Sequence, residues 1–208
     1  MIINIAHTKG GVGKSTIATN LAIEMGADLL DLDTQNSSIG FSLIGPKRDI
    51  KFIKGQGLDT NSLQALSVYK CSKENHLIVD SGGYDSNEIR RMLIMADMII
   101  TPVAVSQVEL MGLENFDKLV HVAKNLSPEL KAYVLFNRVT RFQKDDLVAF
   151  KTYIHTSLTD YEVLDTEIGD RKAFKDAFAA GLSVCELKAN SLAAQEIRAL
   201  VKEIIDKE

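Results

Sequence analysis

Cysteine and proline are scarce in this sequence and tryptophan is absent, which narrows the kinds of protein it can encode. Its cysteines, Cys71 and Cys185, lie far apart and form no Cys-x-x-Cys or His/Cys cluster, so neither a disulfide framework nor a zinc or iron–sulfur site is indicated. We expect both to be packed or reduced thiols. Three prolines and 13 glycines supply no linker rich in Pro, Gly or Ser. At 208 residues, we expect a single domain spanning residues 1–208.

Long hydrophobic runs are also missing. The most apolar stretch, residues 92–105, is interrupted by Asp97 and Pro102 and is shorter than the ~20 residues that a membrane-spanning helix requires. The N-terminus enters an apolar run at once, without the charged region and cleavage site of a signal peptide. We expect a cytoplasmic protein with no transmembrane segment and no membrane binding.

The chain carries no excess of positive charge. Its 24 Lys and Arg residues against 28 Asp and Glu residues give a formal net charge of −4. Dedicated nucleic-acid-binding proteins are strongly basic, so any contact with nucleic acid must come from a local patch. Residues 40–75, which we expect to form a connecting region, are locally basic. The 46% hydrophobic content is typical of a globular chain with a sizeable core.

Short apolar runs of strand length alternate with segments of helical period. The runs are continuous rather than alternating, as expected of strands covered on both faces, and lie at residues 2–6, 29–32, 77–79, 98–103, 132–136 and 161–164. This order predicts an α/β fold with a single doubly wound, mostly parallel sheet flanked by helices. The final helix has an apolar stripe that we expect to pack on the sheet: Ala193, Ile197, Leu200, Val201, Ile204 and Ile205.

A glycine-rich loop follows the first run and opens a helix, as in phosphate-loop NTPases. Its glycines free backbone N–H groups to surround phosphate oxygens, and the N-terminus of the helix adds further donors. Lys14 can reach the β- and γ-phosphates, and the Ser15 hydroxyl can hold Mg²⁺. The sequence therefore predicts a triphosphate cradle formed by Gly10, Gly11, Val12, Gly13, Lys14, Ser15 and Thr16.

Carboxylates end the second and third apolar runs. Asp31 and Asp33 close the second run, and alternation along a strand predicts that they face the same way. Asp80 closes the third run and would deliver one carboxylate to the metal region, through water. Both ends lie at the carboxyl edge of the sheet, where α/β proteins bind ligands. Asp33 could alternatively be a structural residue that caps the following turn.

The order Lys-Gly-Gly-x-Gly-Lys-Ser/Thr, with Thr8 where the general pattern has glycine, resembles the deviant phosphate loop of the ParA/MinD group of ATPases. The resemblance extends through the Asp31 to Gln35 motif, Phe136-Asn137-Arg138, and residues 168–171 and 173–184. Together these stretches are similar to the small ParA-type partition ATPases that lack an N-terminal DNA-binding domain.

This resemblance implies ATP and Mg²⁺ as cofactors and an ATP-dependent homodimer. Lys9 would be the signature lysine, which reaches across the dimer to the partner's phosphates and acts in catalysis with Lys14 and Asp33. Asp33 would position the attacking water, and Asp31 would lie near the Mg²⁺ shell. Asn137 would contact the adenine base, although a turn residue there is the alternative. Thr34 replaces the family's usual proline.

The implied function is a Mg-ATP-dependent dimerising ATPase that partitions plasmid or chromosomal DNA. It would bind DNA without sequence preference, associate with the nucleoid, and hydrolyse ATP weakly until a ParB-like adaptor stimulates it. Candidate contacts to DNA phosphates are Arg141, Lys144, Arg171, Lys172, Lys175 and Lys188.

Other functions occur on the same scaffold. One alternative is a MinD-like ATPase that positions a non-DNA cargo or acts at a membrane. Another is a metabolic enzyme, either an ATP-dependent amide-forming ligase or a nitrogenase-reductase-like electron carrier. The electron carrier would need cysteines placed to share a cluster between subunits, which Cys71 and Cys185 do not match.

Overall fold

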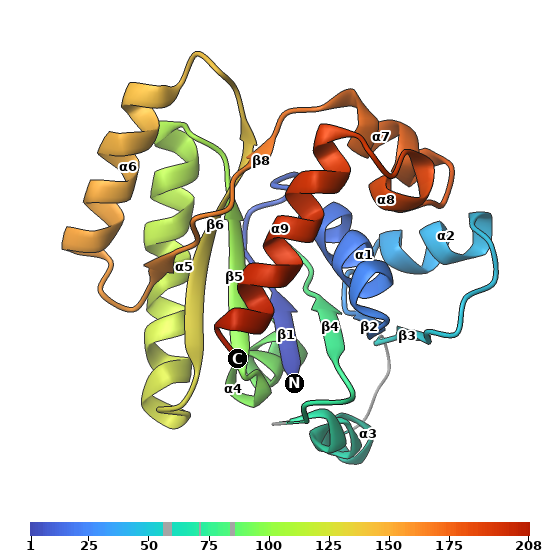
Figure 1. Cartoon of the computed structure of the whole chain (residues 1–208). Helices are drawn as coiled ribbons and strands as arrows, with labels where there is room; N and C mark the ends of the chain where they lie inside the picture. The colour runs from blue at the N-terminus through green and yellow to red at the C-terminus, as the bar shows by residue number, and fades with distance from the viewer. Residues whose placement is uncertain (56–59, 71, 84–85) are drawn as a thin grey trace.

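The computed structural model describes residues 1–55, 60–70, 72–83 and 86–208 and shows one layer of strands between two layers of helices (Figure 1). The strands are β1 (Ile2–Ile5), β2 (Asp28–Asp31), β3 (Phe52–Lys54), β4 (Leu77–Asp80), β5 (Met98–Val103), β6 (Lys131–Val139), β7 (Glu162–Val163) and β8 (Ile168–Gly169). Within the described residues they form an eight-stranded sheet in the order β3-β2-β4-β1-β5-β6-β7, with β8 beside β6. The pairings are parallel, which confirms the predicted fold class.

The helices cover both faces of the sheet. They are α1 (Lys14–Met25), α2 (Ser37–Ile44), α3 (Thr60–Ala65), the 3-10 helix η1 (Leu66–Tyr69), α4 (Asn87–Met95), α5 (Gln107–Leu126), α6 (Lys144–Ser157), α7 (Lys172–Ala179), α8 (Val184–Leu187) and α9 (Leu192–Asp206). One core cluster joins the sheet to α4, α5 and α6 through residues such as Met92, Phe116 and Ile154. The other joins it to α1, α7 and α9. Strands buried on both faces need continuous apolar sequence, which is the pattern observed.

Each predicted apolar run contains a strand, but two short strands were not expected. β3 lies in the segment 40–75 that we predicted as a connection, and this segment also contains the end of α2, α3 and η1. β8 has two residues and was likewise missed. β7 also has two residues, but it lies in the apolar run 161–164, whereas β3 and β8 lie in no such run.

The final helix packs as predicted with one correction. Ala193, Ile197, Leu200 and Ile204 are buried, whereas Ile205 is half-exposed. At about 100° per residue, Ile205 lies beyond the edge of the stripe that faces the sheet. Within the described residues, no helix is long and apolar enough to cross a membrane. Cys185 is a buried free thiol, as expected, and Cys71 lies outside the described residues.

The carboxyl ends of β1, β2 and β4 meet at one edge of the sheet. In the register, Asp80 lies opposite Ile5 of β1 on one side and opposite Asp31 of β2 on the other. The chain runs from β1 to β2 on one side and later places β5 on the other side of β1. Such a change of direction is where open α/β sheets bind ligands, and the glycine-rich loop starts there.

Candidate nucleotide site

The phosphate loop lies between β1 and α1. Gly11 and Gly13 have positive φ angles of 80° and 99°, which favour glycine. Gly13 is the N-cap of α1 and forms no side-chain cap hydrogen bond, and the first turn of α1 contains no acidic residue. The first N–H groups of α1 are therefore available to an anion, and the positive end of the helix dipole favours one.

Lys14 is buried beside this loop, and its ammonium donates a hydrogen bond to the carbonyl oxygen of Lys9 at 2.9 Å. Burial lowers the pKa of Lys14, while the charges of Asp80 and Asp33 act in the opposite direction. Gly83 approaches closely from the end of β4: a Cβ atom there would lie 3.3 Å from the backbone nitrogen of Gly10 and 3.5 Å from Lys14 Nζ. Glycine at position 83 thus leaves room for the lysine.

Asp80 is fully buried at the end of β4, and its Oδ2 accepts a hydrogen bond of 2.7 Å from the Ser38 hydroxyl. Its Oδ1 is buried and has no hydrogen-bond partner among the described residues. Burial raises the pKa of Asp80 to about 7, although Ser38, Ser15 and Lys14 oppose the shift. The unpaired Oδ1 of Asp80 and the nearby Ser15 hydroxyl fit the oxygen-rich shell of Mg²⁺. Asp80 and Ser15 are therefore suited to hold the metal, Asp80 through water.

Asp31 and Asp33 have different hydrogen-bond partners, and the expectation that both face the same way stays a prediction. Asp31 is the last residue of β2, and its Oδ2 accepts hydrogen bonds from the backbone N–H groups of Ser38 and Ile39, each at 3.0 Å. Its Oδ1 accepts from Asp33 N at 2.9 Å. Asp31 therefore anchors the N-terminus of α2, while Asp33, beyond the strand, lines the cavity at the phosphate loop. The Mg²⁺ role of Asp31 stays a prediction.

The turn after β2 forms without the family's usual proline. Asp33 Oδ1 accepts a hydrogen bond from Gln35 N at 3.0 Å, and the Asp33 carbonyl accepts one from Asn36 N at 2.9 Å. Asn36 takes a positive φ of 50°. An aspartate turn and a left-handed asparagine thus fix the segment that contains Thr34.

Two cavities meet at the phosphate loop. The phosphate cavity has a volume of about 270 Å³ and is lined by Gly10, Gly11, Gly13, Lys14, Ser15, Thr16, Asp33, Ser37, Gly83 and Arg138. The base cavity, of about 300 Å³, extends between β6 and α7 and is lined by Gly13, Thr16, Asn137, Arg138, Gly169, Asp170, Arg171, Phe174, Lys175, Phe178 and Ala179. They share Gly13, Thr16 and Arg138, so one nucleotide can extend across both.

Several of these lining residues were not predicted as site residues. Arg138 follows Asn137 in the motif quoted above, yet its presence in both cavities depends on a positive φ of 58°, which a sequence does not reveal. Phe174 and Phe178 are one helical turn apart on α7 and present aromatic rings to the base cavity. Because they are four residues apart, the sequence could have indicated that both side chains lie on one face of α7.

Asn137 connects β6 to the phosphate loop. Its Nδ2 donates a hydrogen bond to the carbonyl oxygen of Val12 at 2.8 Å, and its Oδ1 accepts one from Arg138 N at 2.9 Å. Asn137 also lines the base cavity. Asn137 therefore helps to position the phosphate loop, and its direct contact with adenine stays a prediction.

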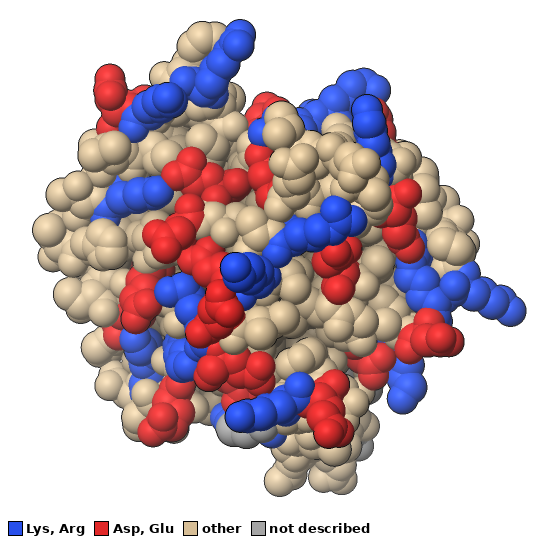
Figure 2. Space-filling view, viewed as in Figure 1, with Lys and Arg blue, Asp and Glu red and all other residues tan. Residues whose placement is uncertain are grey.

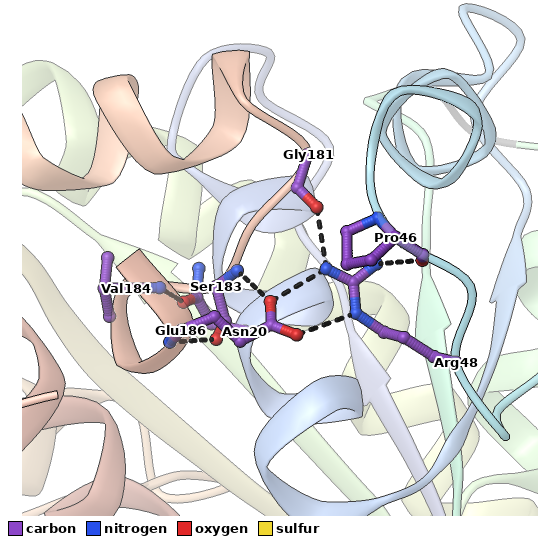
Figure 3. Close-up of polar contacts among 7 residues, drawn as sticks. All are labelled: Asn20, Pro46, Arg48, Gly181, Ser183, Val184 and Glu186. Atoms are coloured by element: carbon purple, nitrogen blue, oxygen red, sulfur yellow. Dashed lines mark hydrogen bonds and ion pairs between the residues drawn. The ribbon is translucent and has the colours of Figure 1, made fainter. Parts of the chain in front are cut away.

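A polar junction fastens the segment after α2 to the chain around α8 and to the turn after α7 (Figure 3). Arg48 donates hydrogen bonds to both carboxylate oxygens of Glu186 and to the carbonyl oxygen of Gly181. Glu186 also completes a capping box with Ser183 at the start of α8. Gly45 touches Gly181 so closely that a Cβ on Gly45 would lie 2.1 Å from the Gly181 oxygen. The segment after α2 is therefore fastened to the turn after α7.

Lys9 does not line the phosphate cavity of its own chain. Its ammonium forms a short ion pair with Glu109 on α5, and its backbone N–H donates to His7 Nδ1 at 3.1 Å. His7 is buried, and burial together with the charges of Lys14 and Lys9 lowers its pKa to about 4. Neither Glu109 nor His7 was predicted as a site residue.

The basic residues predicted to bind DNA are only partly gathered. Arg141, Lys144 and Arg171 line one cavity of about 260 Å³, but Glu167 and Glu196 line it too. Arg171 forms a bidentate ion pair with Glu196, and Lys172 pairs with Asp176. Arg141, Lys144, Lys175 and Lys188 are exposed. Figure 2 shows Lys and Arg side chains along the upper edge, over α6 and α7, and interleaved charges across the face of α9.

Similarity to known proteins covers most of the chain. Residues 3–184 match the family described as the CobQ/CobB/MinD/ParA nucleotide binding domain. The chain is 26% identical to the maintenance of carboxysome distribution protein A of Halothiobacillus neapolitanus over 217 residues, which cover 97% of this chain and 94% of that protein.

Solved structures of the same fold contain nucleotides. A putative plasmid partition protein of Borrelia burgdorferi bound to AMPPNP superposes with a TM-score of 0.75 at 17% identity, covering 100% of this chain and 99% of that one. The septum site-determining protein MinD of Pyrococcus horikoshii, complexed with Mg-ADP, gives a TM-score of 0.70 at 16% identity, covering 98% and 95%. At these identities the likeness concerns the fold.

Proposed function

Because the chain belongs to the CobQ/CobB/MinD/ParA nucleotide-binding family, we propose that it partitions DNA by an ATP-controlled cycle of dimerisation and nonspecific DNA binding. The chain is a positioning ATPase of the ParA/MinD type, with ATP and Mg²⁺ as cofactors. In the proposed cycle, the ATP-bound homodimer associates with the nucleoid in the cytoplasm. A ParB-like adaptor on plasmid or chromosomal DNA then stimulates hydrolysis and resets the dimer.

The position of Lys9 carries this proposal. Lys14 and the glycines face the phosphate cavity, whereas the Lys9 ammonium lies outside it, on α5. An ammonium held beside, but not in, its own phosphate site supports a role toward a second chain. It would stabilise the charge that develops during phosphoryl transfer, as an arginine finger supplied in trans does.

Each residue of the site has a proposed role. Ser15 and Asp80 would hold Mg²⁺, which when bound neutralises charge on the β- and γ-phosphates. When nucleotide binds, the Lys14 ammonium would exchange its hydrogen bond to the Lys9 carbonyl for contacts to the phosphates, because that hydrogen bond crosses the phosphate loop. Asp33, which lines the phosphate cavity, would orient the attacking water.

Exposed apolar side chains lie at the same edge of the sheet. Val108 and Met111 are in the first turns of α5, just beyond the end of β5, and are 65% and 62% exposed. Methionine side chains are enriched in interfaces. A second copy facing the phosphate loop would cover them.

Retention of DNA on a filter tests the proposal. We expect binding with ATP or a non-hydrolysable analogue, weak binding with ADP, and loss of binding in Lys9→Ala. A variant that lacks both Arg141 and Lys144 should show a DNA-binding constant that depends less steeply on salt. In a plot of the logarithm of that constant against the logarithm of salt concentration, the slope should fall by about one for each DNA phosphate that the variant no longer neutralises. Lys118→Ala is the matched control, since Lys118 is exposed on α5 and is not among the predicted DNA contacts. DNA binding that ignores nucleotide, or none despite ATP binding, would contradict the proposal.

A non-DNA cargo is the second candidate, favoured by the near full-length similarity to a carboxysome distribution protein. Such a protein could use the nucleoid as a surface while carrying a protein assembly. Loss of the chain from its host would then scatter that assembly without increasing plasmid loss. Plasmid loss in the same cells would favour DNA as the cargo.

A further inference from the structure

Glu109, on α5, binds the ammonium of Lys9. We call the face of α5 formed by Glu109, Gly112 and Phe116 the seat of Lys9. The Lys9 ammonium pairs with Glu109 Oε1, and the side chains are 32% and 15% exposed, respectively. Glu109 Oε2 is buried without a hydrogen-bond partner among the described residues. The carboxylate therefore interacts with little besides Lys9, and removing its charge should affect Lys9 first.

The rest of the seat is built from the same face of α5. A Cβ atom on Gly112 would lie 3.2 Å from His7 Cε1, a tight contact, and 3.6 Å from Lys9 Cδ, an ordinary one, so both residues lie against this face of the helix. Phe116, one turn further along, stacks on His7 with ring centroids 5.7 Å apart. Glu109, Gly112 and Phe116 share one face at spacings of three and four.

We propose that Glu109 is a positioning residue that holds Lys9 on its own chain and must release it before Lys9 can reach a second copy. This inference rests on the proposed function, in which Lys9 acts in trans. The nucleotide phosphates of the second copy carry more negative charge than one carboxylate and attract the ammonium away from α5. Glu109 thereby sets how much ATP is needed for dimerisation.

Neutralising Glu109 should make dimerisation easier. We expect Glu109→Gln to form dimers at about two- to five-fold lower concentration of a non-hydrolysable ATP analogue than the unchanged protein, as a partly exposed ion pair permits. Glu109→Asp, which keeps the charge, should lie closer to the unchanged protein. Raising salt should narrow the difference, because ions screen the pair.

The test is sedimentation velocity across a series of analogue concentrations at fixed protein and Mg²⁺. Glu114→Gln is the matched control, since Glu114 lies on the same helix and bonds to Tyr153 rather than Lys9.

Three outcomes are informative. A lower midpoint in Glu109→Gln, with Glu114→Gln unchanged, would support the seat. An unchanged or higher midpoint in Glu109→Gln would overturn it, provided that Lys9→Ala fails to dimerise. Normal dimerisation of Lys9→Ala would overturn the role of Lys9 in trans and, with it, the proposed function.

Discussion

The side chain of Asn137 lies directly over Gly13. A Cβ atom on Gly13 would be 2.3 Å from Asn137 Nδ2, the same atom that donates to the carbonyl of Val12. The end of β6 is thus in contact with Gly13, the N-cap residue of α1. Asn137 and Val12 are 125 residues apart in the sequence, yet one side-chain amide ties their segments together at the nucleotide site.

Alanine at Gly13 should destabilise the fold even without nucleotide. Its Cβ would clash with Asn137, and its φ of 99° is unfavourable for any residue with a side chain. We expect a loss of about 2 kcal/mol or more in the free energy of unfolding, measured with urea. Gly10→Ala is the control, since its Cβ would meet nothing within 4 Å. Equal stability of the two variants would contradict the clash.

Asp80→Asn should stabilise the apoprotein while weakening its use of Mg²⁺. Because the folded pKa is raised to about 7 from 3.8, the ionised carboxylate reduces stability as pH rises through this window. The variant should therefore unfold at higher temperature at pH 8, by about 2–4 °C for each kcal/mol recovered, and the gain should shrink toward pH 4. Its Mg²⁺ requirement for hydrolysis should rise by about 10- to 100-fold.

The pH dependence of stability should reveal His7. Its folded pKa of about 4 lies below the usual 6.5, so the unfolded chain binds more protons between these values. Stability from His7 is present above pH 6.5 and is lost as pH falls toward 4, by roughly 2–3 kcal/mol. Asp80 acts in the opposite direction over much of this range, so unfolding should be compared with His7→Asn. Parallel pH profiles would show that His7 is not held neutral.

Removal of Arg48 should loosen the base cavity. Arg48→Met keeps the apolar stem but leaves the Gly181 carbonyl and Glu186 without their donor, at a cost of about 1–3 kcal/mol. Nucleotide affinity should fall as well, because Phe174 and Phe178 lie on the helix that this junction supports. Arg198→Met, which breaks the more exposed pair with Glu24, should change affinity little.

The nucleotide loop could be predicted from sequence because its chemistry depends on consecutive residues. Gly10 to Thr16 are fixed by local spacing, and Asp80 by the end of an apolar run. The different hydrogen-bond partners of Asp31 and Asp33 could not be predicted, since they depend on β2 ending at Asp31 and on α2 placing two N–H groups over that carboxylate.

Contacts between distant segments could not be predicted from the sequence either. The Lys9–Glu109 pair joins residues 100 apart in sequence, and nothing near either residue indicates the other. The same holds for two basic residues predicted to contact DNA: Arg171 pairs with Glu196 on α9 and Lys172 with Asp176 one turn along α7, while their contact with DNA stays a prediction. Sequence thus locates charges better than it locates their partners.

The oligomeric state of the protein with and without a non-hydrolysable ATP analogue tests the central claim most directly. In sedimentation velocity with Mg²⁺, we predict that the chain doubles from its monomer mass of 22.9 kDa when the analogue is added. Lys9→Ala should bind the analogue and stay monomeric. A monomer in every nucleotide state, or a Lys9→Ala dimer as stable as that of the unchanged protein, would contradict an ATP-driven dimer that depends on Lys9.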